Sequence, residues 1–218
     1  MFTDLLNLPI DSARARQQDQ TLSIAGMTWT DYEKFTTEEY SNYRLSYLNG
    51  VITIVSPSQN HEVIERVISI LINAYCRQYN LLYFPMGSTT LKNPPLAGKE
   101  PDTSYSFDIQ KNTPDLAVEV IYSSGETPRR RKTQGNAHQE SGSIDDSLMR
   151  YKYLNVREVW FWQNNEMKFY QLTNSEYREI VESVWLNKIT PDFLAQYVNR
   201  GLTESPLTIE ADFISGLN

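Results

Sequence analysis

The sequence predicts a globular protein of the α/β (α+β) class. Strand-like apolar runs follow one another along the chain with segments of helical periodicity between them. The 218 residues suit one domain with a single sizeable core, although two small domains also fit this length. A hydrophobic content of 40% and a charged content of 22% are ordinary for such a domain.

The N-terminal residues are expected to lie outside the folded domain. Residues 1–25 are polar and show little pattern, so we interpret them as a loosely attached extension and 26–218 as a single domain. The chain starts without the basic residues and apolar segment of a signal peptide. No apolar run approaches the roughly 20 residues that span a bilayer. These features predict a cytoplasmic protein.

Local signals predict the order of helices and strands. Thr30-Asp31-Tyr32-Glu33 has the form of a capping box, which predicts a helix running toward Tyr40. Asn49-Gly50 between two β-prone runs predicts a hairpin with strands over 43–48 and 51–55. The other expected strands span 81–91, 102–107, 114–122, 157–162, 166–173 and 177–185, and the other helices 61–79, 145–154, 190–200 and 207–217.

The net charge bears on nucleic-acid binding, and the cysteine content bears on the state of the thiol. A net charge of -7 counts against a protein that coats nucleic acid through its overall charge, but it leaves room for a locally basic groove. The long loop 123–143 carries Arg129-Arg130-Arg131-Lys132, which fits either contacts with a DNA backbone or a solvated loop. The single cysteine, Cys76, lies in an apolar helical pattern and is expected to be a buried, inert thiol.

Three acidic residues lie in or beside the most apolar strand run. Pro-Asp dipeptides contain Asp102 and Asp115, and Glu119 follows within the apolar run 115–121. Asp115 and Glu119 share a strand face, but four residues at about 3.3 Å each separate their backbones by roughly 13 Å, too far to share one ion. If the 102–107 and 114–122 strands are neighbours, Asp102 and Glu119 approach each other.

Asp102 and Glu119 together have the chemistry of a nuclease-type metal site. Two nearby carboxylates repel each other, and a hard cation such as Mg²⁺ relieves the repulsion through oxygen ligands. The ion activates a water and stabilises charge on a phosphate under attack. In the alternative, Asp102 caps a turn and Glu119 pairs with a basic side chain. A charge inside an apolar run is costly unless it is paired or metal-bound, which favours a functional site.

Three ordered segments carry a resemblance to a known family. Gly98 to Ser104, Pro114 to Gly125 and Tyr151 to Trp162 resemble the putative restriction endonuclease family abundant in cyanobacteria, part of the PD-(D/E)XK nuclease superfamily. The resemblance covers about residues 27–200. It implies a restriction-endonuclease-like core, in which a mixed β-sheet is flanked by helices. It also implies a DNA substrate, Mg²⁺ or Mn²⁺ as cofactor, Asp102 and Glu119 as the acidic site residues, and a fold that suits a homodimer.

One residue of the superfamily pattern is absent. The pattern places a lysine two residues after the glutamate, where this chain has Ile121. Many members of the resembled family carry it on the following helix, four residues before the tyrosine that matches Tyr151, and this chain has Ser147 there. Such a lysine orients the attacking water and offsets charge on the phosphate, which serine does not do. Candidate replacements are Arg150, Lys152 and Lys132.

Three hypotheses follow. The first is a Mg²⁺-dependent DNA endonuclease in which Asp102 and Glu119 hold the metal and Glu65, from the polar side of the 61–79 helix, is a third acidic residue. The second is a catalytically inactive nuclease-fold protein that binds nucleic acid or a protein partner. The third is a structural or dimeric scaffold with a vestigial site. His61 is expected to cap a helix start or satisfy a backbone group, and Trp160 to pack in the core or a dimer contact.

Overall fold

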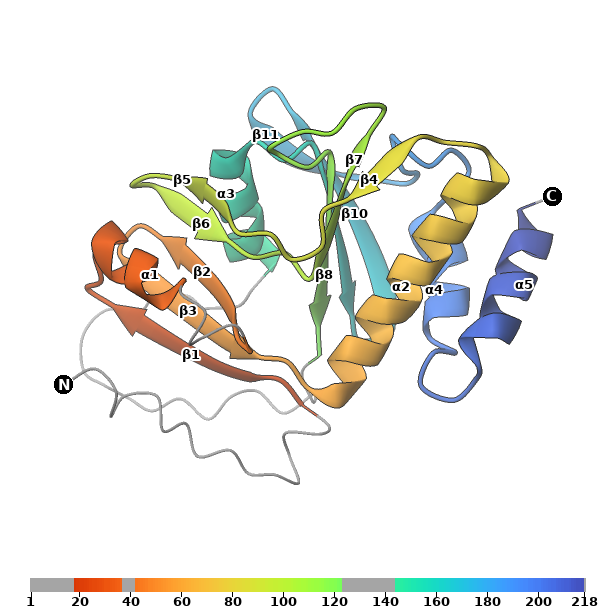
Figure 1. Cartoon of the computed structure of the whole chain (residues 1–218), viewed down its shortest axis with the longest axis horizontal. Helices are drawn as coiled ribbons and strands as arrows, with labels where there is room; N and C mark the ends of the chain where they lie inside the picture. Colours follow the sequence, from red (N-terminus) through yellow and green to blue (C-terminus); the bar gives the residue numbers. More distant parts are fainter. Residues whose placement is uncertain (1–17, 37–41, 123–143, 218) are drawn as a thin grey trace.

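A computed structural model describes residues 18–36, 42–122 and 144–217 of the chain (Figure 1). The helices are α1 (Trp29–Phe35), α2 (Gln59–Gln78), α3 (Ile144–Leu154), α4 (Pro191–Val198) and α5 (Pro206–Gly216). The strands are β1 (Gln20–Ala25), β2 (Arg44–Leu48), β3 (Val51–Ser56), β4 (Tyr83–Pro85), β5 (Leu91–Asn93), β6 (Ala97–Lys99), β7 (Thr103–Phe107), β8 (Leu116–Ile121), β9 (Glu158–Gln163), β10 (Glu166–Thr173) and β11 (Glu176–Ile180).

The strands form two sheets. The first has the order β1-β3-β2-β6-β5 and the second the order β11-β10-β9-β8-β7-β4. In the second sheet β8 runs parallel to β9, whereas β9 and β10 are antiparallel. This confirms the expected α+β fold with a mixed sheet flanked by helices. Among the helices of the described segments, none combines the length and the apolarity needed to cross a membrane.

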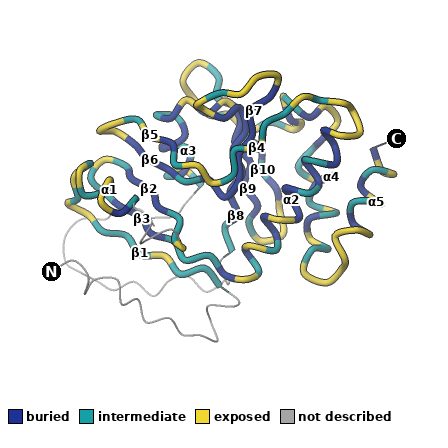
Figure 2. Tube along the Cα trace, in the orientation of Figure 1, coloured by how far each residue is buried: buried dark blue, intermediate teal, exposed yellow. Residues whose placement is uncertain are grey.

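Helices cover both faces of the second sheet (Figure 1). Val118 and Val120 of β8 pack with α2, α4 and α5, whereas Ala117 packs with α3 on the other face, as strand alternation predicts. The burial is densest along β7, β8 and the inner side of α2 (Figure 2). Each fully buried aliphatic side chain of α2 contributes roughly 1.5–3 kcal/mol of transfer free energy. Trp160 and Cys76 are buried here as expected.

The Asn49-Gly50 hairpin of the first sheet is confirmed. Asn49 and Gly50 have φ values of 46° and 85°, which a two-residue turn between twisted strands requires, and β2 pairs with β3 around them. The first helix differs from its prediction because Thr28, not Thr30, forms the capping box. Its hydroxyl accepts the Asp31 N–H at 3.2 Å, and the Asp31 carboxylate accepts the Thr28 N–H at 3.0 Å.

The expected N-terminal extension over 1–25 is wrong for residues 18–25. Residues 20–25 form β1 and pair with β3 from Gln20↔Ser56 to Ala25↔Val51, while 1–17 lie outside the described residues. Leu22 and Ile24 pack against the core of the first sheet, so alternating apolar residues hold this segment in place.

Two expected strands are shorter than predicted. The run 81–91 gives β4, which pairs with β7 as far as Pro85, before Gly87 turns the chain with a φ of 59°. The run 177–185 pairs only as far as Ile180, because the Ser183 hydroxyl then accepts backbone N–H groups in a turn. The loop expected at 123–143 lies outside the described residues.

Candidate functional site

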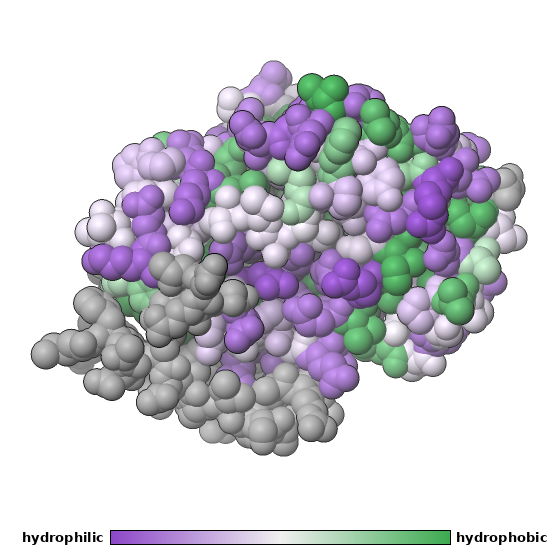
Figure 3. Space-filling view, in the orientation of Figure 1, coloured by the Kyte–Doolittle hydropathy of each residue, from purple (hydrophilic) through white to green (hydrophobic). Residues whose placement is uncertain are grey.

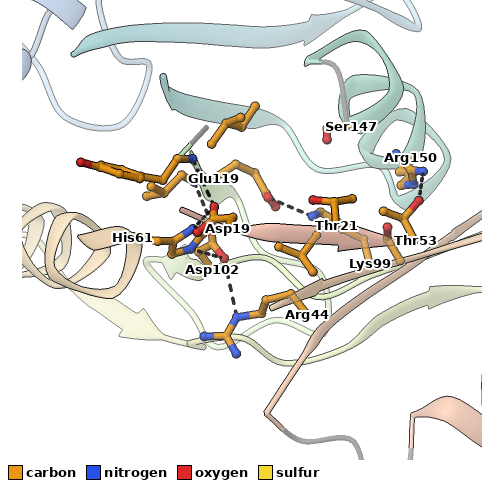
Figure 4. Close-up of a pocket in the computed structure, with 15 residues that line it drawn as sticks. Asp19, Thr21, Arg44, Thr53, His61, Lys99, Asp102, Glu119, Ser147 and Arg150 are labelled. Carbon is orange, nitrogen blue, oxygen red and sulfur yellow. Dashed lines mark hydrogen bonds and ion pairs between the residues drawn. The ribbon is translucent and has the colours of Figure 1, made fainter. Parts of the chain in front are cut away.

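Both sheets contribute residues to one cavity of about 120 Å³ (Figure 4). Its polar lining holds four basic side chains and three carboxylates, together with hydroxyl groups of the first sheet and α3. The basic residues are Arg44, His61, Lys99 and Arg150, and the acidic ones are Asp19, Asp102 and Glu119. On the face shown in Figure 3, hydrophilic residues gather near the centre, while hydrophobic patches appear toward α2 and α5.

Strand pairing positions Asp102 beside Glu119. Asp102 directly precedes β7, and its backbone N–H donates to the carbonyl of Val118 on β8 at 3.2 Å. Its Oδ2 accepts the N–H of Val120 at 2.7 Å, so the carboxylate is fixed one residue from Glu119. The expected adjacency of the two strands is confirmed, and both carboxylates line the same cavity.

His61 lies between Asp19 and Asp102 (Figure 4). Its Nδ1 is 2.8 Å from Asp19 Oδ2, and its Nε2 is 3.1 Å from Asp102 Oδ1, an ion-pair distance without hydrogen-bond alignment. Burial alone would lower the pKa of His61, but the two carboxylates outweigh it and raise the pKa to about 10. His61 is therefore a cation at neutral pH, and the expected backbone-capping role is replaced by an ion-pair role.

The charge of His61 also governs Asp102. Burial acts to raise the pKa of this carboxyl, but His61, Lys99 and the Val120 N–H together hold it below its ordinary value. Arg44 adds a weaker contact, with its Nε 3.6 Å from Asp102 Oδ1. Asp102 is accordingly a stable carboxylate.

Glu119 is held by a lysine and a tyrosine. Lys99 Nζ lies 2.9 Å from Glu119 Oε2, and the Tyr151 hydroxyl donates to Oε1. Both side chains of the ion pair are at least 90% buried. Burial raises the pKa of Glu119; Lys99 opposes this shift, and the nearby charge of Asp102 adds to it. Burial and Glu119 also raise the pKa of Tyr151 well above its usual value, so the tyrosine keeps its proton and donates it to the hydrogen bond.

Sequence reasoning missed Lys99, Arg44 and Asp19. Lys99 is the last residue of β6. The three residues of this strand pair with β2 and β5, and they are too few to show a periodic pattern in the sequence. Its position three residues before Asp102, inside the segment that carries the family resemblance, was the available signal. Asp19 was not considered as a site residue, because its segment was interpreted as an extension outside the folded domain.

The expected replacements for the absent lysine lie in different places. Arg150 lines the cavity, and so does Ser147, one helical turn before it on α3. Lys152 does not line the cavity and pairs with Glu176 at 2.8 Å. Lys132 lies outside the described residues. Lys99 is thus the lysine that the described structure brings to the carboxylates.

Glu65 occupies a different environment from the one expected. It is 6% exposed rather than on a polar helix face, and its carboxylate accepts the Ser69 hydroxyl at 2.8 Å. Burial raises its pKa. It is not among the residues that line the cavity.

The donor set determines which metal ion the cavity suits. In residues 18–36, 42–122 and 144–217, no three or more His, Cys, Asp or Glu side chains are grouped so that they could hold a metal ion. A full protein cage is therefore absent from these segments. Mg²⁺, however, commonly binds through one or two carboxylates and completes its shell with waters and substrate phosphates. Asp102 and Glu119, facing one cavity, fit that mode of binding.

The fold and cavity define a class of protein. A mixed sheet flanked by helices, with paired carboxylates and basic side chains in one buried pocket, is an arrangement typical of enzymes that act on phosphodiesters. The family model described as "Putative restriction endonuclease" (Uma2) matches residues 29–195, and the chain belongs to this family.

One solved structure that matches is the crystal structure of a putative nuclease belonging to DUF820 from Anabaena variabilis. It is 14% identical, the match covers 86% of this chain and 99% of that chain, and the TM-score is 0.47. A search of curated proteins finds no match.

Proposed function

We propose that the protein hydrolyses phosphodiester bonds of DNA in this cavity, with Asp102 and Glu119 as its acidic residues and Mg²⁺ or Mn²⁺ as cofactor. The observation that carries the proposal is the position of Lys99, which lies 2.9 Å from Glu119 in the cavity that Asp102 also lines. An Asp, a Glu and a Lys in one buried pocket provide the three groups that the family resemblance implies, although the lysine comes from another strand.

Each group has a chemical role in this proposal. The divalent ion, held by Asp102 and Glu119, would supply positive charge to the phosphate and acidify a water. Lys99 orients the attacking water beside Glu119 and offsets charge that develops on the phosphate oxygens. The water oxygen forms a bond to phosphorus as one P–O ester bond breaks, and the proton that the water loses is balanced by the proton that the leaving oxygen gains. His61 and the Val120 N–H hold the Asp102 carboxylate in place.

Plasmid cleavage tests the proposal. Wild-type protein is incubated with supercoiled plasmid in Mg²⁺, in Mn²⁺ and in EDTA, and is compared with Asp102→Asn, Glu119→Gln and the control Glu179→Gln. Glu179 is exposed on β11 and does not line the cavity. We expect metal-dependent nicking that falls about 100-fold or more in the two cavity variants, in line with the loss of a group that acts on the reacting water. Equal nicking by all four proteins would identify a contaminating nuclease and remove the support for hydrolysis.

A second candidate function is DNA binding without cleavage. It is favoured by Ile121 and Ser147 at the two positions where the lysine is expected, and by the pairing of both carboxylates with cations. In this case the wild-type protein retards a DNA duplex in a mobility-shift assay, but leaves plasmid intact in Mg²⁺ and in Mn²⁺. Nicking that depends on Asp102 and Glu119 would contradict it.

A further inference from the structure

We propose that Arg150, assisted by Arg44, binds a single phosphate group of the DNA backbone inside the cavity, while the attached nucleosides stay outside. The inference rests on the proposed function only in taking this cavity as the place where DNA is engaged. It concerns binding, and it applies to both the cleaving and the non-cleaving candidate.

Arg150 is a buried cation with an N–H group left unpaired. It is 4% exposed, its Nη2 makes a long 3.3 Å hydrogen bond to the neutral Thr53 hydroxyl, and its Nε has no hydrogen-bond partner. The charges of Asp146 and Glu119 act to raise its pKa, but burial outweighs them and holds the pKa of Arg150 below its ordinary value. A buried donor without an acceptor is costly, so an anion that accepts a hydrogen bond from this arginine gains binding free energy in the cavity.

Pairing among the other lining residues singles out Arg150. Lys99 pairs with Glu119, and His61 lies between Asp19 and Asp102. These contacts engage all three carboxylates of the cavity. Arg150, which also lines the cavity, has a buried Nε without a hydrogen-bond partner.

Arg44 presents a second buried donor from β2. Its Nε is buried without a hydrogen-bond partner and lies 3.6 Å from Asp102 Oδ1, which is too long for a hydrogen bond. Its Nη2 makes a 3.4 Å contact with Glu62. The two arginines reach the cavity from the first sheet and from α3, and guanidinium groups suit phosphate oxygens because their N–H groups form a planar fork.

The size of the cavity limits what enters. A cavity of about 120 Å³ is small and suits one phosphate group. Pockets that enclose drug-sized molecules measure about 300–1,000 Å³, so a nucleoside does not fit inside this one. A backbone phosphate would therefore enter while the sugars and bases remain at the mouth.

Binding of inorganic phosphate and of a short DNA duplex, both in EDTA, tests the proposal. Phosphate binding is followed by ³¹P NMR line broadening at constant ionic strength, and duplex binding by fluorescence anisotropy. The proteins are wild type, Arg150→Gln and the control Arg66→Gln, whose side chain is 70% exposed on α2. We expect Arg150→Gln to weaken both interactions about 10- to 100-fold, the loss typical of a hydrogen bond to a charged group, and Arg66→Gln to leave phosphate binding unchanged.

Three results would overturn the proposal. The first is phosphate binding by folded Arg150→Gln with wild-type affinity, and the second is no saturable phosphate binding by the wild type. The third is a loss of phosphate binding with unchanged duplex binding, which would mean that the cavity takes free phosphate and not the backbone. If Arg150→Gln does not fold, Arg44→Gln, whose side chain is 20% exposed, is subject to the same criteria.

The outcomes separate this inference from the proposed hydrolysis. If Arg150→Gln loses phosphate and duplex binding while the wild type never nicks plasmid, the phosphate site stands and hydrolysis fails. If plasmid is nicked in a manner that depends on Asp102 and Glu119 but Arg150→Gln binds phosphate normally, hydrolysis stands and the phosphate site fails.

Discussion

Replacing Lys99 by methionine should destabilise the protein in a pH-dependent manner. The substitution keeps an unbranched side chain of similar length but removes the charge that lies 2.9 Å from Glu119. Glu119 is 6% exposed, so its carboxylate has little access to water when the ammonium group is gone. The Tyr151 hydroxyl still donates to it, but a neutral donor does not replace a counter-ion.

The magnitude follows from the burial of the pair. Removing one partner of a buried ion pair costs about 3–5 kcal/mol, because the other charge stays buried and uncompensated. The pKa of Glu119, which burial already raises above its usual 4.5, rises further when Lys99 is absent. The folded variant then binds a proton more tightly than the unfolded chain, so its stability falls as pH rises above 4.5. We expect a loss of about 3 kcal/mol at pH 8 and a smaller loss at pH 5.

Urea unfolding in EDTA at pH 5 and pH 8 measures this loss. Lys152→Met is the matched control, because Lys152 also pairs with a glutamate at 2.8 Å, but that partner, Glu176, has a side chain that is 72% exposed. An exposed pair of this kind contributes about 0–1 kcal/mol. If Lys99→Met lost no more stability than the control, or the same amount at both pH values, the assignment of Lys99 and Glu119 as a buried ion pair would be refuted.

Three further predictions concern the same cavity. Adding Ser147→Lys to Lys99→Met should restore part of the plasmid cleavage that Lys99→Met loses, because Ser147 lines the same cavity. If the double variant nicked plasmid no faster than Lys99→Met alone, this would count against interchangeable lysine positions. The free energy of unfolding of the wild type in EDTA should fall between pH 6.5 and about 10. A histidine whose pKa is raised in the folded state stabilises the protein below pH 6.5 and no longer does so above its folded pKa. Urea titrations should therefore show a flatter dependence of stability on pH for His61→Gln. Glu65→Gln should change plasmid cleavage less than about twofold, because its carboxylate bonds to Ser69 and not to the cavity; a loss as large as that of Glu119→Gln would establish Glu65 as the third acidic residue.

Local sequence signals predicted the parts of the fold that depend on neighbouring residues. The Asn49-Gly50 turn fixes its hairpin through backbone conformation alone, and the apolar stripe of α2 predicts a helix without reference to its partners. The approach of Asp102 to Glu119 was predicted on the condition that the 102–107 and 114–122 strands are neighbours, and β7 and β8 do pair.

The rest of the cavity depends on contacts between distant segments. Lys99 reaches Glu119 because β6 joins β2 in the first sheet, and Arg44 reaches Asp102 through the same sheet. A strand of three residues, such as β6, is too short to show the alternation that identifies a strand in a sequence. The pairing of β6 with β2 therefore has no signature in the sequence. Glu65 was predicted in the wrong environment. It was assigned to an exposed helix face, but the fold covers that face, and Ser69 provides the hydrogen bond that a buried carboxylate requires.

The position of Asp19 ties the cavity to the edge of the first sheet. Its carboxylate accepts the Ser58 and Tyr122 backbone N–H groups and meets His61, so a single side chain beside β1 joins both sheets and the start of α2. In the described part of the chain, β1 is paired on one side only, with β3, and such outer strands separate from a sheet at lower free energy than central ones. When β1 detaches, His61 loses a carboxylate and Asp102 loses part of its support. The electrostatic state of two buried residues is thus coupled to the opening of a strand at the edge of its sheet.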